Sequence, residues 1–204
     1  MIKSLLASLS TAALLALAPC AQAATVVDTG TPGGNAVGAL AFDAFDWVAG
    51  QVSFTQAAQI GAIQGHILGG AAGETFDVSL FAADGGAGPG TLLYTTTATF
   101  GADGWNGVSG LDGWHVAAGS YWIGFEIQGG DTLGSSSVTG ALFDTGAPAP
   151  LATTASTSDA GFSYAEGPLT FGLRVSTVPW PSTASLMLSG LALLSTLGVA
   201  RRRR

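Results

Sequence analysis

Apolar and polar residues alternate with a period of two along several short stretches of the chain, and this pattern predicts β-strands. The clearest stretches are residues 121–128 and 169–176, in which every second side chain is apolar. A third series, residues 92–100, places Thr95, Thr97 and Thr99 on one face, and β-branched threonine favours strands. Further runs predict shorter strands at Val52–Thr55, Ile60–Leu68, Phe76–Phe81, Trp114–Val116 and Ser136–Phe143.

Turn-forming residues separate these runs. Asp84–Gly90 predicts the loop of a hairpin, and Gly129-Gly130-Asp131 ends the strand of residues 121–128. Asn106-Gly107 and Asp112-Gly113 predict turns that need a positive φ. Short strands at this spacing predict an all-β fold, an antiparallel β-sandwich or jelly roll.

Two stretches show no strand pattern. Ala147–Ser158 is rich in Ala, Pro, Thr and Ser and is expected to be a long surface loop. Thr25–Gly34 is expected to be a loose arm, and Trp47 is expected in the core.

The charged residues are few and unevenly placed. They make up 9% of the 204 residues, and the formal net charge is −7. Lys3 and Arg201–Arg204 lie at the ends, so that residues 24–177 carry thirteen acidic residues and only Arg174, a formal charge of −12. Such a surface repels a phosphate backbone, and nucleic acid is therefore excluded as a partner.

The N-terminus has the pattern of a secretory signal peptide over residues 1–23. Lys3 precedes the apolar run Leu5–Leu17, and Ala21-Gln22-Ala23 is a cleavage site that would release a chain beginning at Ala24. A retained membrane anchor and lipid attachment at Cys20 are the alternatives. Cleavage would leave the mature chain without cysteine, and hence without disulfides.

The C-terminus, residues 178–204, has three parts. Val178, Pro179, Trp180, Pro181, Ser182 and Thr183 come first, then the uncharged run Ala184–Ala200, and then Arg201, Arg202, Arg203 and Arg204. As a helix the apolar run would measure about 25 Å, and the arginines would keep the tail on the cytoplasmic side of a transmembrane helix. A plain tail anchor is the alternative.

This tripartite tail resembles the PEP-CTERM sorting signal of Gram-negative bacteria. Val178, Pro179, Pro181, Ser182 and Thr183 match the usual V-P-E-P-S-T pattern, whereas Trp180 stands in place of Glu. The resemblance implies processing by the membrane transpeptidase exosortase, in a bacterium that makes exopolysaccharide. Phe76–Ile127 is also similar to β-sandwich modules of secreted bacterial proteins with sorting tails.

The sequence contains no recognisable catalytic constellation. His66 and His115 have no ligand or base motif around them, and no G-x-S-x-G is present. Nothing brings two carboxylates together as a glycosidase requires, and Glu126 is expected to be solvated on the polar side of its strand. We therefore expect that the protein is not an enzyme.

Two kinds of binding residue remain as candidates. Trp105, Trp114 and Trp122 are candidates for stacking against sugar rings, with core packing as the alternative. Trp122 would be exposed if its sheet face is open. Asp43, Asp46, Asp84, Asp103 and Asp112 are candidate ligands for a structural Ca²⁺, with turn formation as the alternative.

These observations lead to one expectation and one alternative. We expect a β-sandwich ectodomain, residues 24–177, that signal peptidase and exosortase process while it is held in the inner membrane. It would then reach the cell surface or the exopolysaccharide matrix and have a structural or adhesive role. The alternative is a carbohydrate-binding, lectin-like module that uses the tryptophans, with or without Ca²⁺.

Overall fold

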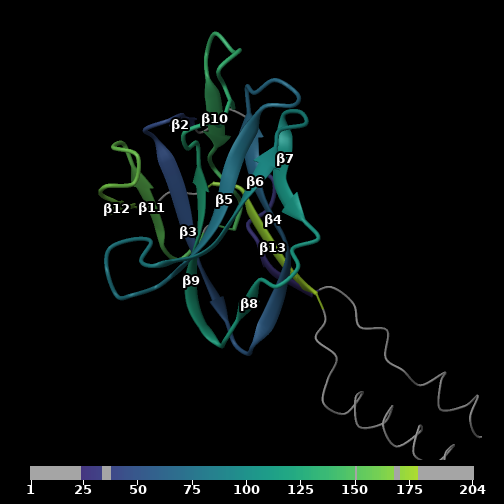
Figure 1. Cartoon of the computed structure of the whole chain (residues 1–204), viewed down its shortest axis with the longest axis vertical. Coiled ribbons are helices and arrows are strands. Elements are labelled where there is room, and N and C mark those ends of the chain that lie inside the picture. The colour runs from purple at the N-terminus through teal and green to yellow at the C-terminus, as the bar shows by residue number, and fades with distance from the viewer. Residues whose placement is uncertain (1–23, 34–37, 150, 168–170, 179–204) are drawn as a thin grey trace, which may run out of the picture. The chain divides into compact units, whose positions relative to one another are not determined.

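A computed structural model describes residues 24–33, 38–149, 151–167 and 171–178. These residues form two antiparallel β-sheets (Figure 1). One compact unit spans Ala23–Val178. The strands are β1 Ala24–Asp28, β2 Ala39–Phe42, β3 Trp47–Phe54, β4 Ala58–Leu68, β5 Thr75–Ala82, β6 Leu92–Thr99, β7 Gly104–Ser109, β8 His115–Val116, β9 Gly119–Glu126, β10 Ala141–Asp144, β11 Thr154–Thr157, β12 Ala165–Gly167 and β13 Leu173–Val178.

The first sheet is organised around β4, a strand of 11 residues. Its strand order is β1-β13-β4-β10-β2, and β7 and β8 also pair with β4. The register sets Leu173 of β13 opposite Gly65, and Asn106 of β7 opposite the same glycine. The N-terminal and C-terminal strands, β1 and β13, therefore lie side by side.

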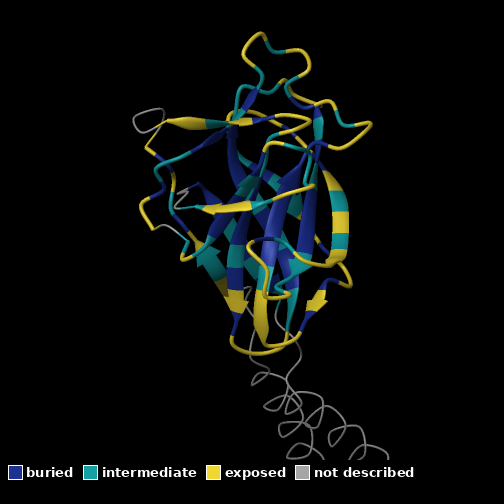
Figure 2. Ribbon diagram, turned by 90° about the vertical axis from the view of Figure 1, so that its left-hand side faces the viewer, coloured by how far each residue is buried: buried dark blue, intermediate teal, exposed yellow. Residues whose placement is uncertain are grey.

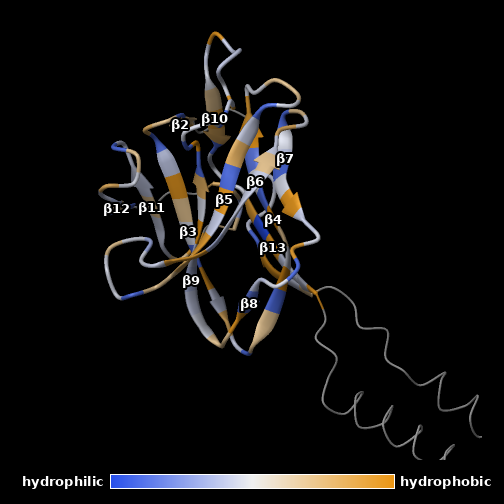
Figure 3. Ribbon diagram, in the orientation of Figure 1, coloured by the Kyte–Doolittle hydropathy of each residue, from blue (hydrophilic) through white to orange (hydrophobic). Residues whose placement is uncertain are grey.

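The second sheet has the order β12-β11-β3-β9-β5-β6. β3, β9 and β5 are neighbours, each of eight residues, and they alternate inward apolar residues with outward ones. β6 and β12 are its two edges. Figure 3 shows this alternation of apolar and polar residues along the strands.

The core lies between the two sheets and is rich in phenylalanine. Phe125 of β9 lies with its ring centroid 5.0 Å from that of Phe143 of β10, and Phe42 lies 4.8 Å from Phe143. All three rings are fully buried. Gly65 leaves room for them, since a Cβ there would lie 2.7 Å from Phe143. Figure 2 shows the buried residues along the central strands and the exposed ones in the loops and in some strands.

Most of the predicted strands are confirmed. β4, β5, β6, β8 and β9 nearly coincide with the predicted runs, and Asp84–Gly90 joins β5 to β6. β10 retains only the end of the predicted run Ser136–Phe143. The run 169–176 is confirmed as β13, which begins later, at Leu173.

The predicted turn at Asn106-Gly107 is wrong, because both residues lie inside β7. Asn106 is buried, and its side chain bonds the backbone of the turn before the strand. Its amide group donates to the carbonyl oxygens of Ala102 and Gly104, and its Oδ1 accepts from the amide of Gly101. Asn106, a residue type common within turns, thus lies in a strand and stabilises the neighbouring turn with its side chain.

The predictions of a loose arm at Thr25–Gly34 and of a long surface loop at Ala147–Ser158 are also wrong. The arm contains β1, which pairs with β13, and the loop contains β11, which pairs with β3. Their partners are distant in the sequence, so that local composition did not reveal them.

The described part of the chain has no helix with the length and apolar character needed to cross a membrane. The predicted signal peptide, the sorting motif from Pro179 to Thr183, the apolar run 184–200 and the arginine tail lie outside the described residues. Val178 is the last residue of β13.

Candidate functional site

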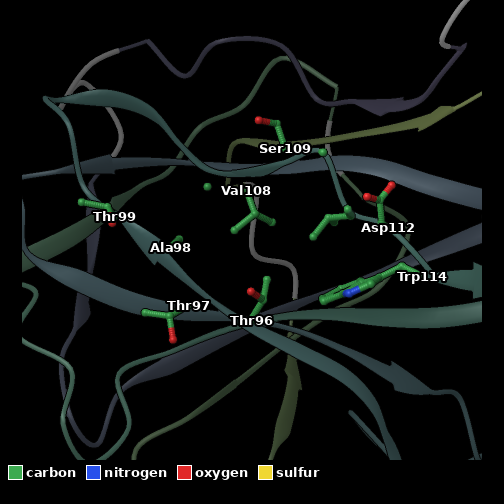
Figure 4. Close-up of a pocket in the computed structure, with 11 residues that line it drawn as sticks. Thr96, Thr97, Ala98, Thr99, Val108, Ser109, Asp112 and Trp114 are labelled. Atoms are coloured by element: carbon green, nitrogen blue, oxygen red, sulfur yellow. The ribbon is translucent and has the colours of Figure 1, made fainter.

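A groove runs along one edge of the sandwich, between the edge strands β6 and β7. It encloses about 500 Å³ and is lined by Thr96–Thr99 on one side and Gly107–Asp112 on the other, with Trp114. β6 pairs with β5 and β7 pairs with β4, so that the two strands face each other without a ladder between them. Figure 4 shows the two segments on opposite sides of the groove.

The lining of this groove is mostly polar. Thr96, Thr99 and Ser109 supply hydroxyl groups, and Asp112, which is exposed, supplies a carboxylate. The apolar part comes from Ala98, Val108, Leu111 and Trp114, and Trp114 is 7% exposed. Such a lining offers donors and acceptors to a ligand rich in hydroxyl groups.

Trp114 is held by a second aromatic ring. Its ring centroid lies 5.3 Å from that of Tyr94, and the two rings are inclined by only 19°. Because this stack and the core cover most of the indole, only a small part of it is open to the groove.

Trp105, on β7, lies on the outer face of the first sheet, away from Trp114. The guanidinium of Arg174 lies 3.8 Å from the centroid of the Trp105 ring, in a cation–π contact. His66 packs edge-on against the same ring at 5.2 Å. Arg174 therefore already covers one face of this indole.

Trp122 is buried, with 1% exposure, so the sheet face is not open at this position and the packing alternative holds for this residue. It lies on the outer face of the second sheet and packs with Ala49 and Ala155, beneath Phe81 and Tyr164. The structure does not bring the three predicted tryptophans together.

The five candidate Ca²⁺ ligands lie in different loops, except for Asp43 and Asp46. Oδ1 of Asp43 accepts hydrogen bonds from the amides of Phe45 at 2.7 Å and Asp46 at 3.0 Å. Burial and the Asp43 charge raise the pKa of Asp46. Among the described residues, no three His, Cys, Asp or Glu side chains gather where they could hold a metal ion.

The other candidate carboxylates serve their own loops. Oδ2 of Asp84 accepts from the amide and the hydroxyl of Thr91, which closes the loop between β5 and β6. Oδ1 of Asp103 accepts from the amide of Gly69 at 2.7 Å. Asp112 lines the groove described above.

His66 forms a contact that the sequence did not reveal. Its Nδ1 lies 3.2 Å from Oδ2 of Asp144, and the Asp144 side chain is completely buried. Neither carboxylate oxygen accepts a hydrogen bond within the described part of the chain. The contact joins β4 to β10 and holds the imidazole against Trp105. His115 is exposed on β8.

Glu126 is buried, and the expectation that it is solvated is wrong. It is 3% exposed, on the outer face of the second sheet. Burial raises its pKa, and the nearby carboxylates add to this effect, whereas hydrogen bonds from Ser79 and Gln128 oppose it. Asp77 is its direct partner across the strands.

Glu74 joins two loops at one end of the sandwich. Its carboxylate accepts hydrogen bonds from the amides of Ala71, Gly134 and Ser136 and from the hydroxyls of Ser135 and Ser136. Burial raises the pKa of Glu74, but these bonds outweigh burial and lower it to about 2. Spacing in the sequence gave no sign of this cluster.

No protein-family model matches the chain, and no curated protein matches it.

Proposed function

We propose that this protein is an exported β-sandwich that is processed at both ends and has a structural or adhesive role, without catalysis. It resides at the cell surface or in the exopolysaccharide matrix of a Gram-negative bacterium. Signal peptidase and exosortase are its partners during export, and residues 184–200 hold it transiently in the inner membrane.

One observation carries this proposal. The compact unit, Ala23–Val178, begins and ends where the two predicted export signals meet the domain. β1 starts at Ala24, the predicted first residue of the mature chain, and β13 ends at Val178, the first residue of the sorting motif. Removal of both signals would therefore leave the core and both sheets complete except for Val178, the last residue of β13.

The chemistry of the described residues supports a role without catalysis. The buried carboxylates of Glu74 and Glu126 are held by hydrogen bonds, and His66 is packed between Asp144 and Trp105. Arg174 is paired with Asp28 at 3.1 Å. A catalytic site needs such groups to converge on space for a substrate.

Accessibility on intact cells tests the proposal. An epitope inserted after Gly86, which is exposed and has open space around its Cβ position, would leave the sheets intact. We expect an antibody to reach this epitope on whole cells, and a variant without Arg201–Arg204 to stay in the inner-membrane fraction. An epitope that the antibody reaches only after lysis would contradict the proposal.

Carbohydrate binding is the second candidate, and the groove between β6 and β7 favours it. The groove combines hydroxyl groups, the Asp112 carboxylate and a small exposed part of the Trp114 indole, which suits a ligand with hydroxyls and apolar C–H faces. Because Trp114 is part of the core, replacing it would destabilise the fold, and a loss of binding could not be assigned to the groove.

A better test changes the polar lining. Residues 24–178 would be retained on the exopolysaccharide of the producing organism, with and without Ca²⁺. We expect retention to fall in Asp112→Asn and in Thr96→Val combined with Ser109→Ala, but not in the control Thr55→Val, which is exposed elsewhere. Unchanged retention in the groove variants would exclude the groove as the binding site.

A further inference from the structure

We propose that a second surface for polysaccharide lies on the loops around Phe45 and Phe162, and that its ligand is a neutral polysaccharide. We call this surface, made of residues 43–47 and 158–163, the aromatic tip. The inference rests on the carbohydrate-binding candidate above and adds a separate site to it.

The aromatic tip carries two large apolar side chains that are open to solvent. Phe45 is 64% exposed and Phe162 is 91% exposed. Trp47, which was expected in the core, is half-buried beside them. Local sequence pattern does not reveal this group, because its two phenylalanines lie in segments that are far apart in the chain.

One hydrogen bond and one close packing contact join the two loops into one surface. The amide of Ala160 donates to the carbonyl oxygen of Phe45 at 3.0 Å. Gly161 lies against the indole of Trp47, so that a Cβ at this glycine would be 2.5 Å from the ring. Residues far apart in the sequence, in the loops before β3 and before β12, thus meet at one place.

Each loop is also fixed internally. Asp43 accepts from the amides of Phe45 and Asp46, as described above. Asp159 accepts from the amide of Ser163 at 2.9 Å, and from the hydroxyls of Ser163 and Thr157, both at 2.5 Å. The exposed rings are therefore carried on ordered backbone, which lowers the entropic cost of binding.

A hollow of about 180 Å³ adjoins Trp47 and supplies polar partners. Its lining includes the hydroxyls of Ser156, Thr157 and Ser158 and the carboxylate of Asp46. An aromatic ring beside hydroxyls and a carboxylate matches a sugar, which has an apolar C–H face and hydroxyls around its rim.

The charge of the tip selects among polysaccharides. Asp43, Asp46 and Asp159 surround it, and these loops carry no Lys or Arg. Acidic polysaccharides and anionic lipid surfaces would be repelled. A neutral chain is the ligand that remains compatible with both the rings and the charge.

The tip and the groove lie at opposite edges of the second sheet. β12 and β11 are at one end of the strand order, and β6 is at the other. A single domain with both sites would therefore bind two chains at once, and such bridging suits a structural role in a matrix.

Affinity electrophoresis of residues 24–178 in gels with a neutral β-glucan or with acidic alginate tests the tip. This segment contains both sheets and their core. We expect Phe45→Ala combined with Phe162→Ala to weaken glucan binding about tenfold, since two ring contacts are lost. The control, Leu92→Ala combined with Val138→Ala, removes exposed apolar side chains elsewhere and should bind as the wild type does.

The outcomes separate the tip from the broader proposal. If the tip variant binds glucan within about threefold of the wild-type affinity, the aromatic tip is not a binding site and the groove remains as the site. Stronger binding to alginate than to glucan would overturn the assigned ligand. Sedimentation with phosphatidylcholine vesicles, but no binding to glucan, would make the tip a lipid contact instead. Wild type that binds no polysaccharide at all would reject carbohydrate binding as a whole.

Discussion

The hydroxyl of Thr177 donates a hydrogen bond to the carbonyl oxygen of Ala24 at 3.3 Å, and the two residues are register partners in the pair of β1 and β13. The predicted first residue of the mature chain thus lies beside the last residue before the sorting motif. The predicted signal peptide and the predicted sorting signal therefore flank this one strand pair, and a chain without them would keep both strands except for Val178.

The buried hydroxyl of Thr29 stabilises the end of this strand pair. Thr29 is 1% exposed, and its Oγ1 accepts from the amide of Leu173 at 2.8 Å. Thr29→Val leaves that buried amide without a partner, and we expect a loss of about 2 kcal/mol in the free energy of unfolding. Urea unfolding followed by tryptophan fluorescence measures it. Thr25→Val, at an exposed position of β1, should change stability by less than about 0.5 kcal/mol.

Glu74 is expected to stabilise the fold in a pH-dependent way. Its pKa is about 2 in the folded protein and 4.5 ordinarily, so its contribution is complete above pH 4.5 and is lost as the pH falls toward 2. In Glu74→Gln the amide group meets backbone donors, and we expect a loss of about 2 kcal/mol at pH 7. Unfolding at several pH values should show the two proteins converging near pH 2. A constant difference would show that ionisation is not the cause.

Glu126 is expected to change the free energy of unfolding with the opposite dependence on pH. Burial raises its pKa in the folded state, so its ionisation opposes folding, and wild-type stability falls as the pH rises from 4.5 through the raised value. Glu126→Gln keeps an acceptor for the Ser79 hydroxyl and removes this effect. We expect the free energy of unfolding of the variant to rise relative to that of the wild type as the pH rises above 4.5. Glu166→Gln, exposed on β12, is the matched control and should show no such trend.

Gly107 allows the close approach of β7 to β4. A Cβ at this position would lie 2.1 Å from the carbonyl oxygen of Ile63 and 2.8 Å from Cα of Gln64, and backbone cannot move aside cheaply. We expect Gly107→Ala to destabilise the protein by about 2 kcal/mol or more. Gly129→Ala has open space around its Cβ and should be nearly neutral. Equal thermal midpoints for the two variants would refute this reading of the contact.

Alternation along the chain was enough to predict the all-β class and most central strands, because each strand of the sandwich faces the core on one side. Strands β6, β9 and β13 follow from this rule directly, whereas short apolar runs indicated β4 and β5. The rule failed where a strand depends on a distant partner, as β1 and β11 do, since such pairing leaves no local pattern in a short segment.

The candidate site was harder to predict than the fold. A period of two places Trp122 and Glu126 correctly on the outer face, but it does not reveal that Phe81 and Tyr164 cover that face. The Glu74 cluster and the His66–Asp144 contact join residues far apart in sequence. The exposed Phe45 and Phe162 were not predicted as a group, because the loops that bring them together are far apart in the sequence and show no periodic pattern.

The intact mass of the protein recovered from the producing cells tests the central claim most directly. The account predicts a mature chain that begins at Ala24 and lacks Arg201–Arg204, found with the cell surface or the exopolysaccharide. A chain that retains residues 1–23 and the arginine tail would contradict export and sorting, whatever the sandwich binds.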